Sequence, residues 1–247
     1  MKKIIGFSLV AAIALVACKT LDQAVGEVNK QIGGTTGGVG LSNAEIINGL
    51  KDALTQGTNK SSSRAAQMDG FNKNPKIRIP FPPAVQNVKD NAIKFGLKSQ
   101  VDKFEETLNR AAEEAAKGAA TIFIDAIKKM TVSDGLAILR GTDTAATHFL
   151  RDKCTASLNT AFKPTVKNAT QKVELTKYWT PLTSAWNKVP GHAPVNTDLD
   201  QYVTDRAVDG LFKLIGEEET NIRINPAARA TDIMKKVFGS KDNPHNK

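Results

Sequence analysis

The sequence predicts an all-α protein with a single multi-helix, bundle-like domain and one or two short extended segments. Apolar residues recur every three or four positions through most of the chain, a spacing typical of helices packed around a core. We find no series of alternating apolar and polar residues and no internal repeat, so a β-sheet is not expected. Hydrophobic residues make up 40% and charged residues 24% of the chain, which is typical of a folded globular protein.

The N-terminus has the pattern of a secretory signal peptide. Lys2 and Lys3 precede an uncharged apolar run that is too short for a permanent membrane span. The run ends in Leu-Val-Ala-Cys, which resembles a bacterial lipobox with Cys18 as the acylated residue. We therefore expect residues 1–17 to be removed and acyl chains such as palmitate on Cys18 to attach the protein to a membrane. The alternative is an ordinary secretory signal that happens to end near a cysteine.

Three further segments follow from the pattern. Residues 18–41 form the lipid-anchored N-terminal segment, which ends in a Gly-rich run suited to a flexible tether. Residues 42–239 form the all-α domain, and residues 240–247 form a polar, flexible tail.

The formal net charge is +9. We do not expect nucleic acid as a partner, because the signal peptide directs the chain out of the cytoplasm. The positive balance fits anionic lipid headgroups or other polyanions of the cell envelope. If Cys18 is acylated, Cys154 has no disulfide partner, and its place in an apolar helical pattern predicts a buried thiol.

The first half of the domain is predicted from Ser42. Ser42 and Glu45 form a capping box, and an apolar stripe then runs to Met68. Prolines forbid a helix in residues 74–83, where Ile77, Ile79 and Phe81 alternate with polar residues or proline. A short helix over residues 84–96 and one long helix over residues 99–130 follow.

The second half contains four more predicted elements. A short helix covers residues 133–140, and Thr142 or Asp143 caps the next helix, which Pro164 should kink or interrupt. Asn196 or Thr197 caps another long helix, which ends before Pro226. A last helix ends at Gly239. We expect Glu217-Glu218-Glu219 and Lys235-Lys236 to be solvated surface.

Dispersed blocks between Ser42 and Gly239 resemble a family of uncharacterised bacterial lipoproteins, the DUF4197-like domain of unknown function. The blocks include Asp69-Gly70-Phe71, Asn74-Pro75-Lys76-Ile77-Arg78-Ile79-Pro80, Gly141-Thr142-Asp143-Thr144-Ala145-Ala146-Thr147 and Asn225-Pro226-Ala227-Ala228-Arg229. The resemblance implies a lipoprotein with one helical domain. It implies no activity, and no catalytic residue is carried over from it.

Chemical motifs are sparse. The three histidines have no ligand spacing, so we expect no zinc site, and neither a P-loop nor a Gly-x-Ser-x-Gly motif occurs. We expect no cofactor. One candidate polar cluster remains, in which a histidine base could meet hydroxyl, carboxylate and guanidinium groups. Its members are Arg110, Asp125, Asp143, Thr144 and His148. The alternative is a capped helix with one polar histidine, beside charges that form solvated faces or ion pairs.

These observations favour a non-enzymatic lipoprotein of the bacterial cell envelope. It would be a binding or structural module whose partner is a lipid, an envelope polymer or an envelope protein. Lys19 follows Cys18, where inner-membrane lipoproteins have an aspartate, which favours the outer membrane. The alternative is a membrane-proximal hydrolase or transferase that uses the candidate polar cluster.

Overall fold

The computed structural model describes residues 40–172, 179, 184, 187, 188, 194 and 198–244. By its internal contacts the chain divides into two units, Met1–Gly40 and Leu41–Lys247, and the helical domain lies in the second. The predicted signal peptide, Cys18 and the anchor segment as far as residue 39 lie outside the described residues.

The described residues form eight α-helices and no strand, which confirms the all-α prediction. None of these helices is both long and apolar enough to cross a membrane. The elements are α2 (Asn43–Ala66), the 3₁₀ turn η1 (Pro83–Val85), α3 (Gln86–Lys94), α4 (Lys98–Ala116), α5 (Ala119–Lys128), α6 (Val132–Arg140), α7 (Ala145–Thr170), α10 (Leu199–Ile224), the 3₁₀ turn η2 (Pro226–Ala228) and α11 (Asp232–Phe238).

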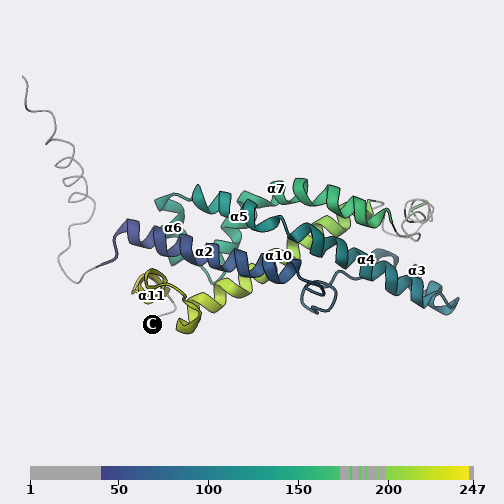
Figure 1. The fold of residues 1–247 in the computed structure, drawn as a ribbon, viewed down its shortest axis with the longest axis horizontal. Coiled ribbons are helices and arrows are strands. Elements are labelled where there is room, and N and C mark those ends of the chain that lie inside the picture. Colours follow the sequence, from purple (N-terminus) through teal and green to yellow (C-terminus); the bar gives the residue numbers. More distant parts are fainter. Residues whose placement is uncertain are drawn as a thin grey trace, which may run out of the picture. The chain divides into compact units, whose positions relative to one another are not determined.

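Helices α2 and α10 carry much of the packing. Helix α10 contacts α7, α2 and α4, while α2 also packs against α4, α5, α6 and α11. Figure 1 shows α6, α11 and the beginning of α2 at one end of this unit and α3 at the other. Of the 26 residues of α10, 14 are buried, because other helices cover a wide apolar face of it.

The start of α2 confirms the predicted capping box. The Ser42 Oγ accepts a hydrogen bond of 3.2 Å from the backbone N–H of Glu45, and the Glu45 carboxylate accepts one of 2.9 Å from the N–H of Ser42. Lys236 of α11 also pairs with Glu45, and with the Ser42 bonds it lowers the pKa of that carboxyl to about 2. One partly exposed carboxylate therefore links the beginning of α2 to α11.

The predicted long helix over residues 99–130 is two helices, α4 and α5. They separate at Lys117 and Gly118, whose N–H groups bond to Glu114 and Ala115 three residues earlier. Glycine is a poor helix former, so the helical ladder is weakest there. The break lets α5 pack against both α2 and α7.

Pro164 does not interrupt α7, contrary to one of the predicted alternatives. The helix continues from Ala145 to Thr170 with Pro164 inside it. Pro164 is exposed, so the Thr160 carbonyl that lacks its usual donor lies on the solvent side, where water can satisfy it.

The N-terminus of α7 is capped from another helix. Thr144 is the N-cap residue, but its side chain makes no capping bond, and neither Thr142 nor Asp143 takes that position. Instead, the Glu219 carboxylate of α10 accepts hydrogen bonds from the N–H groups of Ala146, at 2.9 Å, and Thr147, at 2.8 Å. Glu219 was expected on the solvated surface and is buried, because it falls on the apolar face of α10.

Two buried arginines complete this arrangement. The Arg223 guanidinium bonds the Glu219 carboxylate at 2.9 Å and the Ile138 carbonyl in the last turn of α6 at 2.7 Å. Arg229 donates to the carbonyls of Ile222, at 3.0 Å, and Arg223, at 2.8 Å, near the end of α10. Burial lowers the pKa of Arg229. We call Glu219, Arg223 and Arg229 the junction clamp.

The structure adds detail to two predictions for the C-terminal half, the cap of the long helix and the tail after residue 239. Asp198 caps α10 through the Gln201 N–H at 2.9 Å, whereas Asn196 and Thr197 lie outside the described residues. The expected loose tail begins with an anchored turn, because the buried Asn243 side chain donates to the Phe238 carbonyl at 2.6 Å.

Replacing the clamp carboxylate should destabilise the fold strongly. We expect Glu219→Gln to lower the free energy of unfolding by about 3 kcal/mol, because it leaves Arg223 charged in a buried site. Glu114→Gln is the control. Glu114 pairs in solvent with Lys117 at 2.5 Å, and its loss should cost less than about 1 kcal/mol. Urea unfolding followed by circular dichroism measures both, and equal losses would contradict the role of the clamp.

Candidate functional site: a basic groove between α7 and α10

The extended segment that follows α2 forms one wall of the site. Ile77, Ile79 and Phe81 are buried, which confirms the predicted alternation. The segment crosses α10 at Gly210, where a Cβ atom would lie 2.8 Å from the Phe71 ring. Glycine at this position lets the segment lie against the helix backbone.

On the side of the extended segment that faces away from α10, buried polar residues of α4 form hydrogen bonds with its backbone. The Asn109 side chain accepts a 2.8 Å hydrogen bond from the Ile79 N–H and donates one of 2.8 Å to the Ile79 carbonyl. Glu113 accepts bonds of 3.1 Å from the N–H groups of Phe71 and Asn72. Glu105 accepts one of 3.2 Å from the Phe81 N–H. We call Glu105, Asn109 and Glu113 the α4 polar stripe.

The two carboxylates of the stripe pair with cationic side chains from the segment, from α3 and from α4 itself. Lys89 and Arg78 bond Glu105 at 2.5 and 2.7 Å. Burial alone would raise the pKa of Glu105, but these two hydrogen bonds outweigh it and lower that pKa. Arg110 bonds Glu113 at 2.8 Å and Asp69 at 2.7 Å.

These contacts also shift two pKa values at the start of the segment. Lys73, followed by Arg110, lowers the pKa of Asp69 to about 2. The Arg110 pKa is raised, first by its hydrogen bond to Glu113. Both groups are therefore firmly charged at neutral pH.

Contacts to α10 fix the outer edge of the segment. Lys76 pairs with Glu217 at 2.9 Å, and the Lys213 ammonium donates to the Lys76 carbonyl at 2.9 Å. The Tyr202 hydroxyl donates to the Pro80 carbonyl at 3.2 Å. The side chain of Lys76 is thereby held beside α10 and α7.

An open groove of about 590 Å³ lies between α7, α10 and this segment. Its floor is formed by small and apolar groups, including Phe212, Gly216 and Thr147. Its other lining residues are polar or charged: Lys76, Thr144, His148, Arg151, Lys213, Glu217 and Thr220. Lysine, arginine and histidine nitrogens thus surround an apolar floor.

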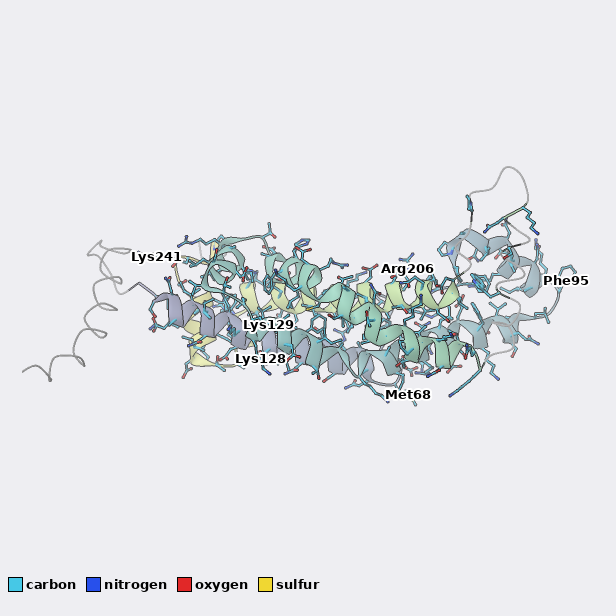
Figure 2. The ribbon with its side chains drawn as sticks, turned by 90° about the horizontal axis from the view of Figure 1, so that it is seen from above. Met68, Phe95, Lys128, Lys129, Arg206 and Lys241 are labelled. Carbon is cyan, nitrogen blue, oxygen red and sulfur yellow. The ribbon has the colours of Figure 1, made fainter. Side chains whose placement is uncertain are left out.

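A smaller hollow of about 170 Å³ continues the basic surface along α10. It shares Lys76 and Lys213 with the groove and adds Arg78 and Arg206. Arg206 lies at the surface (Figure 2), where its guanidinium stands 5.5 Å from the centre of the Tyr202 ring. Among the described residues, neither Arg206 nor Lys213 forms an ion pair with a carboxylate.

Arg151 is positioned by both helices that form the groove. Its guanidinium pairs with Asp209 at 2.7 Å and lies 4.5 Å from the centre of the Phe212 ring. Stacking on an aromatic face restricts the guanidinium while leaving donors available at its edge. We refer to the groove and the adjoining hollow together as the basic groove.

The structure separates the members of the predicted polar cluster. Thr144 and His148 line the basic groove, and Asp143 lies exposed in the turn before α7. Arg110 belongs to the network around Asp69 and Glu113. Asp125 lines a different groove, of about 490 Å³, and pairs with Lys128 at 3.7 Å.

Other sequence candidates have structural roles. Cys154 is buried as predicted, and burial raises the pKa of its thiol to about 11. Within residues 40–172 and 198–244, no three His, Cys, Asp or Glu side chains gather closely enough to hold a metal ion. A cavity of about 20 Å³ beside the junction clamp has room for one water molecule but not for a lipid chain.

Sequence reasoning missed the residues that build the site: Glu105, Asn109 and Glu219. A signal for each was present, because polar residues fell on the apolar stripe of a helix, where burial forces them to find a partner. Asn109 lies four residues from Glu105 and from Glu113, and Glu219 lies four residues after Ile215. The sequence did not indicate which backbone groups they would meet.

Comparisons with known proteins support the family resemblance. The sequence model of a family described as "Protein of unknown function (DUF4197)" matches residues 40–239. No curated protein and no solved structure shows a significant match to the chain.

The α4 polar stripe should make stability depend on pH. The pKa of Glu105 is lower in the folded than in the unfolded state, so its contribution is present above the unfolded pKa and is lost as the pH falls. We expect Glu105→Gln to lower the free energy of unfolding by about 2 kcal/mol at neutral pH. The variant should also lose less stability than the wild type between about pH 5 and about pH 2.

Urea midpoints measured across this range check the prediction. Glu114→Gln is the control, since Glu114 is an exposed carboxylate on the same helix that pairs only with Lys117 in the described structure. A Glu105→Gln variant with the same acid dependence as the wild type would contradict it.

Proposed function

Since this chain belongs to the DUF4197 family of proteins of unknown function, we propose a function from the chemistry of its own surface. It is a lipid-anchored protein of the bacterial cell envelope, held by acyl chains on Cys18, with the outer membrane as the favoured site. Its helical domain is a non-enzymatic binding module whose basic groove takes an extended polyanion carrying phosphate or carboxylate groups. The observation that carries this proposal is the set of cations along the groove.

The distribution of charge supports an anionic ligand. Lys76, Arg151 and Lys213 line the groove, and Arg78 and Arg206 continue the row along the adjoining hollow. Lys76, Arg151 and Arg78 pair with Glu217, Asp209 and Glu105. Arg206 and Lys213 pair with no carboxylate of the described residues, so these two cations are the excess positive charge. Cations on the walls of a cleft raise the local concentration of anions and steer their approach.

The shape of the site supports a polymer rather than a small molecule. Pockets for small ligands enclose most of the ligand surface, whereas this groove is open to solvent. An extended chain can place successive anionic groups beside successive cations. Its apolar parts can lie against the floor at Phe212 and Gly216.

The arrangement gives less support to catalysis. Nucleophilic catalysis needs a hydroxyl, a base in hydrogen-bond reach and a third group that orients the base. His148 shares the groove with threonines, but the Thr147 hydroxyl donates to Glu219, at 2.8 Å. Asp125, the predicted acid or base partner, lies at a different groove.

Changing the anchor cysteine should release the protein from the membrane. We expect wild-type protein to incorporate radioactive palmitate and to fractionate with the outer membrane, and Cys18→Ser to do neither. Cys154→Ala is the matched control, because it removes the chain's other thiol, which is buried and whose pKa burial raises to about 11. Palmitate labelling that persists in Cys18→Ser would disprove acylation at this site.

Neutralising the groove should weaken polyanion binding. With polyphosphate and polyglutamate as probes, we expect Lys76→Gln/Lys213→Gln to bind about tenfold more weakly, at about 0.5–1 kcal/mol for each cation lost. Lys128→Gln/Lys241→Gln changes the net charge equally but lies away from the groove, and it should bind as the wild type does. Titration calorimetry at two salt concentrations measures both variants.

A third variant tests the shape of the groove without changing the net charge of the protein. A Cβ atom on Gly216 would lie 3.6 Å from Thr144 and Thr147, an ordinary contact, so Gly216→Ala should fold and make the floor shallower. We expect it to weaken binding without changing charge. Equal binding by all variants, or equal losses in the lysine pair and its control, would reject the groove as the binding site.

A further inference from the structure

Large apolar side chains are exposed to solvent at the turn between α3 and α4. In the described part of the chain, six large hydrophobic residues are exposed, and three of them lie within this turn: Ile93, Phe95 and Leu97. Phe95 is 82% exposed. Figure 2 shows it at the extremity of the turn, away from the packed helices. We call Ile93, Lys94, Phe95, Leu97 and Lys98 the α3–α4 tip.

Backbone hydrogen bonds hold the tip in a defined shape. The Leu97 N–H bonds the Ala92 carbonyl at 2.9 Å, and the Gly96 N–H bonds the Ile93 carbonyl at 3.0 Å. This pair of bonds is a Schellman motif, with Gly96 at φ 80° in the left-handed region. A Cβ atom on Gly96 would have no neighbour within 4 Å, so the turn projects clear of the rest of the domain.

The motif usually buries the hydrophobic residue that follows its glycine. That residue here is Leu97, and 44% of it remains exposed. No residue of α3 is buried, although Val88 and Ala92 pack partly against the core. The apolar groups of the tip are therefore displayed outward by an ordered turn.

The charge around the tip points to an anionic partner. Lys94 and Lys98 flank the apolar residues, and Lys98 pairs with Asp102 at 2.5 Å on the first turn of α4. Lys94 forms no ion pair with any described residue. Lysine can extend its ammonium to phosphate groups while its alkyl chain and a neighbouring aromatic ring sit in a less polar layer.

We propose that the α3–α4 tip inserts into the headgroup region of an anionic lipid bilayer, as a second membrane contact of this protein. The proposal rests on the proposed function in one respect, because the lipid on Cys18 would keep the domain close to a membrane. A convex turn with three apolar side chains can enter a bilayer interface. It is too small for a stable protein interface, which buries about 800 Å² on each partner.

Vesicle binding by protein without lipid tests this contact directly. The probe is vesicles of equimolar phosphatidylcholine and phosphatidylglycerol, and the protein is the chain from residue 18 with Cys18→Ser, which carries neither signal peptide nor acyl chains. We expect it to co-sediment with these vesicles at low salt and to bind pure phosphatidylcholine vesicles more weakly. Phe95→Ser/Leu97→Ser should lower the partition coefficient by at least about tenfold, because an aromatic side chain no longer leaves water.

The matched control is Met68→Ser. Met68 is also 82% exposed but lies away from the tip on the side of the bundle (Figure 2). We expect this variant to bind as strongly as the unsubstituted protein. Circular dichroism of each variant checks the fold, which these exposed substitutions should leave intact.

Three outcomes would overturn the proposal. They are no binding of the unsubstituted protein to anionic vesicles, no loss in Phe95→Ser/Leu97→Ser, or an equal loss in Met68→Ser. Loss in Lys76→Gln/Lys213→Gln with full binding by the tip variant would assign headgroup recognition to the basic groove instead. The Cys18→Ser chain used in this experiment has no acyl chains. If it fails to bind vesicles, the palmitate and polyphosphate tests of the proposed function are therefore unaffected.

Discussion

The buried carboxylate of Glu219 is the interaction on which the rest of the domain depends. It satisfies the free N–H groups at the start of α7, while Arg223 bonds both this carboxylate and the last turn of α6. A buried charge is tolerated only where partners surround it, so α6, α7 and α10 must meet at this point. Arg229 closes the end of α10 in the same way. The clamp thereby fixes the separation of α7 and α10, and with it the floor of the basic groove.

The backbone N–H and C=O groups of the buried extended segment also need hydrogen-bond partners. Three prolines in four positions keep the segment out of an α-helix, and no strand of the described residues lies beside it to satisfy its backbone. The α4 polar stripe takes the place of a strand, since Glu105, Asn109 and Glu113 are spaced by four residues and face the same side. This support is also what presents Lys76 and Arg78 at the edge of the groove. Structural polar groups and surface cations thus belong to one arrangement.

The two surfaces proposed for binding differ in their chemistry. The basic groove combines an open, partly apolar floor with cations along its sides, which suits a chain with repeated negative charge. The α3–α4 tip combines protruding apolar side chains with flanking lysines, which suits the boundary of a bilayer. A tethered domain with both features would bind polymers near a membrane through its groove. Its tip would hold it close to that membrane.

The sequence by itself determined the helical class, the capping box at Ser42, the burial of Cys154, the stop at Pro226 and the alternation of Ile77, Ile79 and Phe81. Each depends on local periodicity or on the backbone limits of one residue. Tertiary structure decided the rest: the break at Gly118, the continuation through Pro164, the capping of α7 by Glu219 and the dispersal of Arg110, Asp125 and His148. The periodicity of a helix tells which face is buried, but a polar group on that face finds its partner on an element many residues away, and only packing brings the two together.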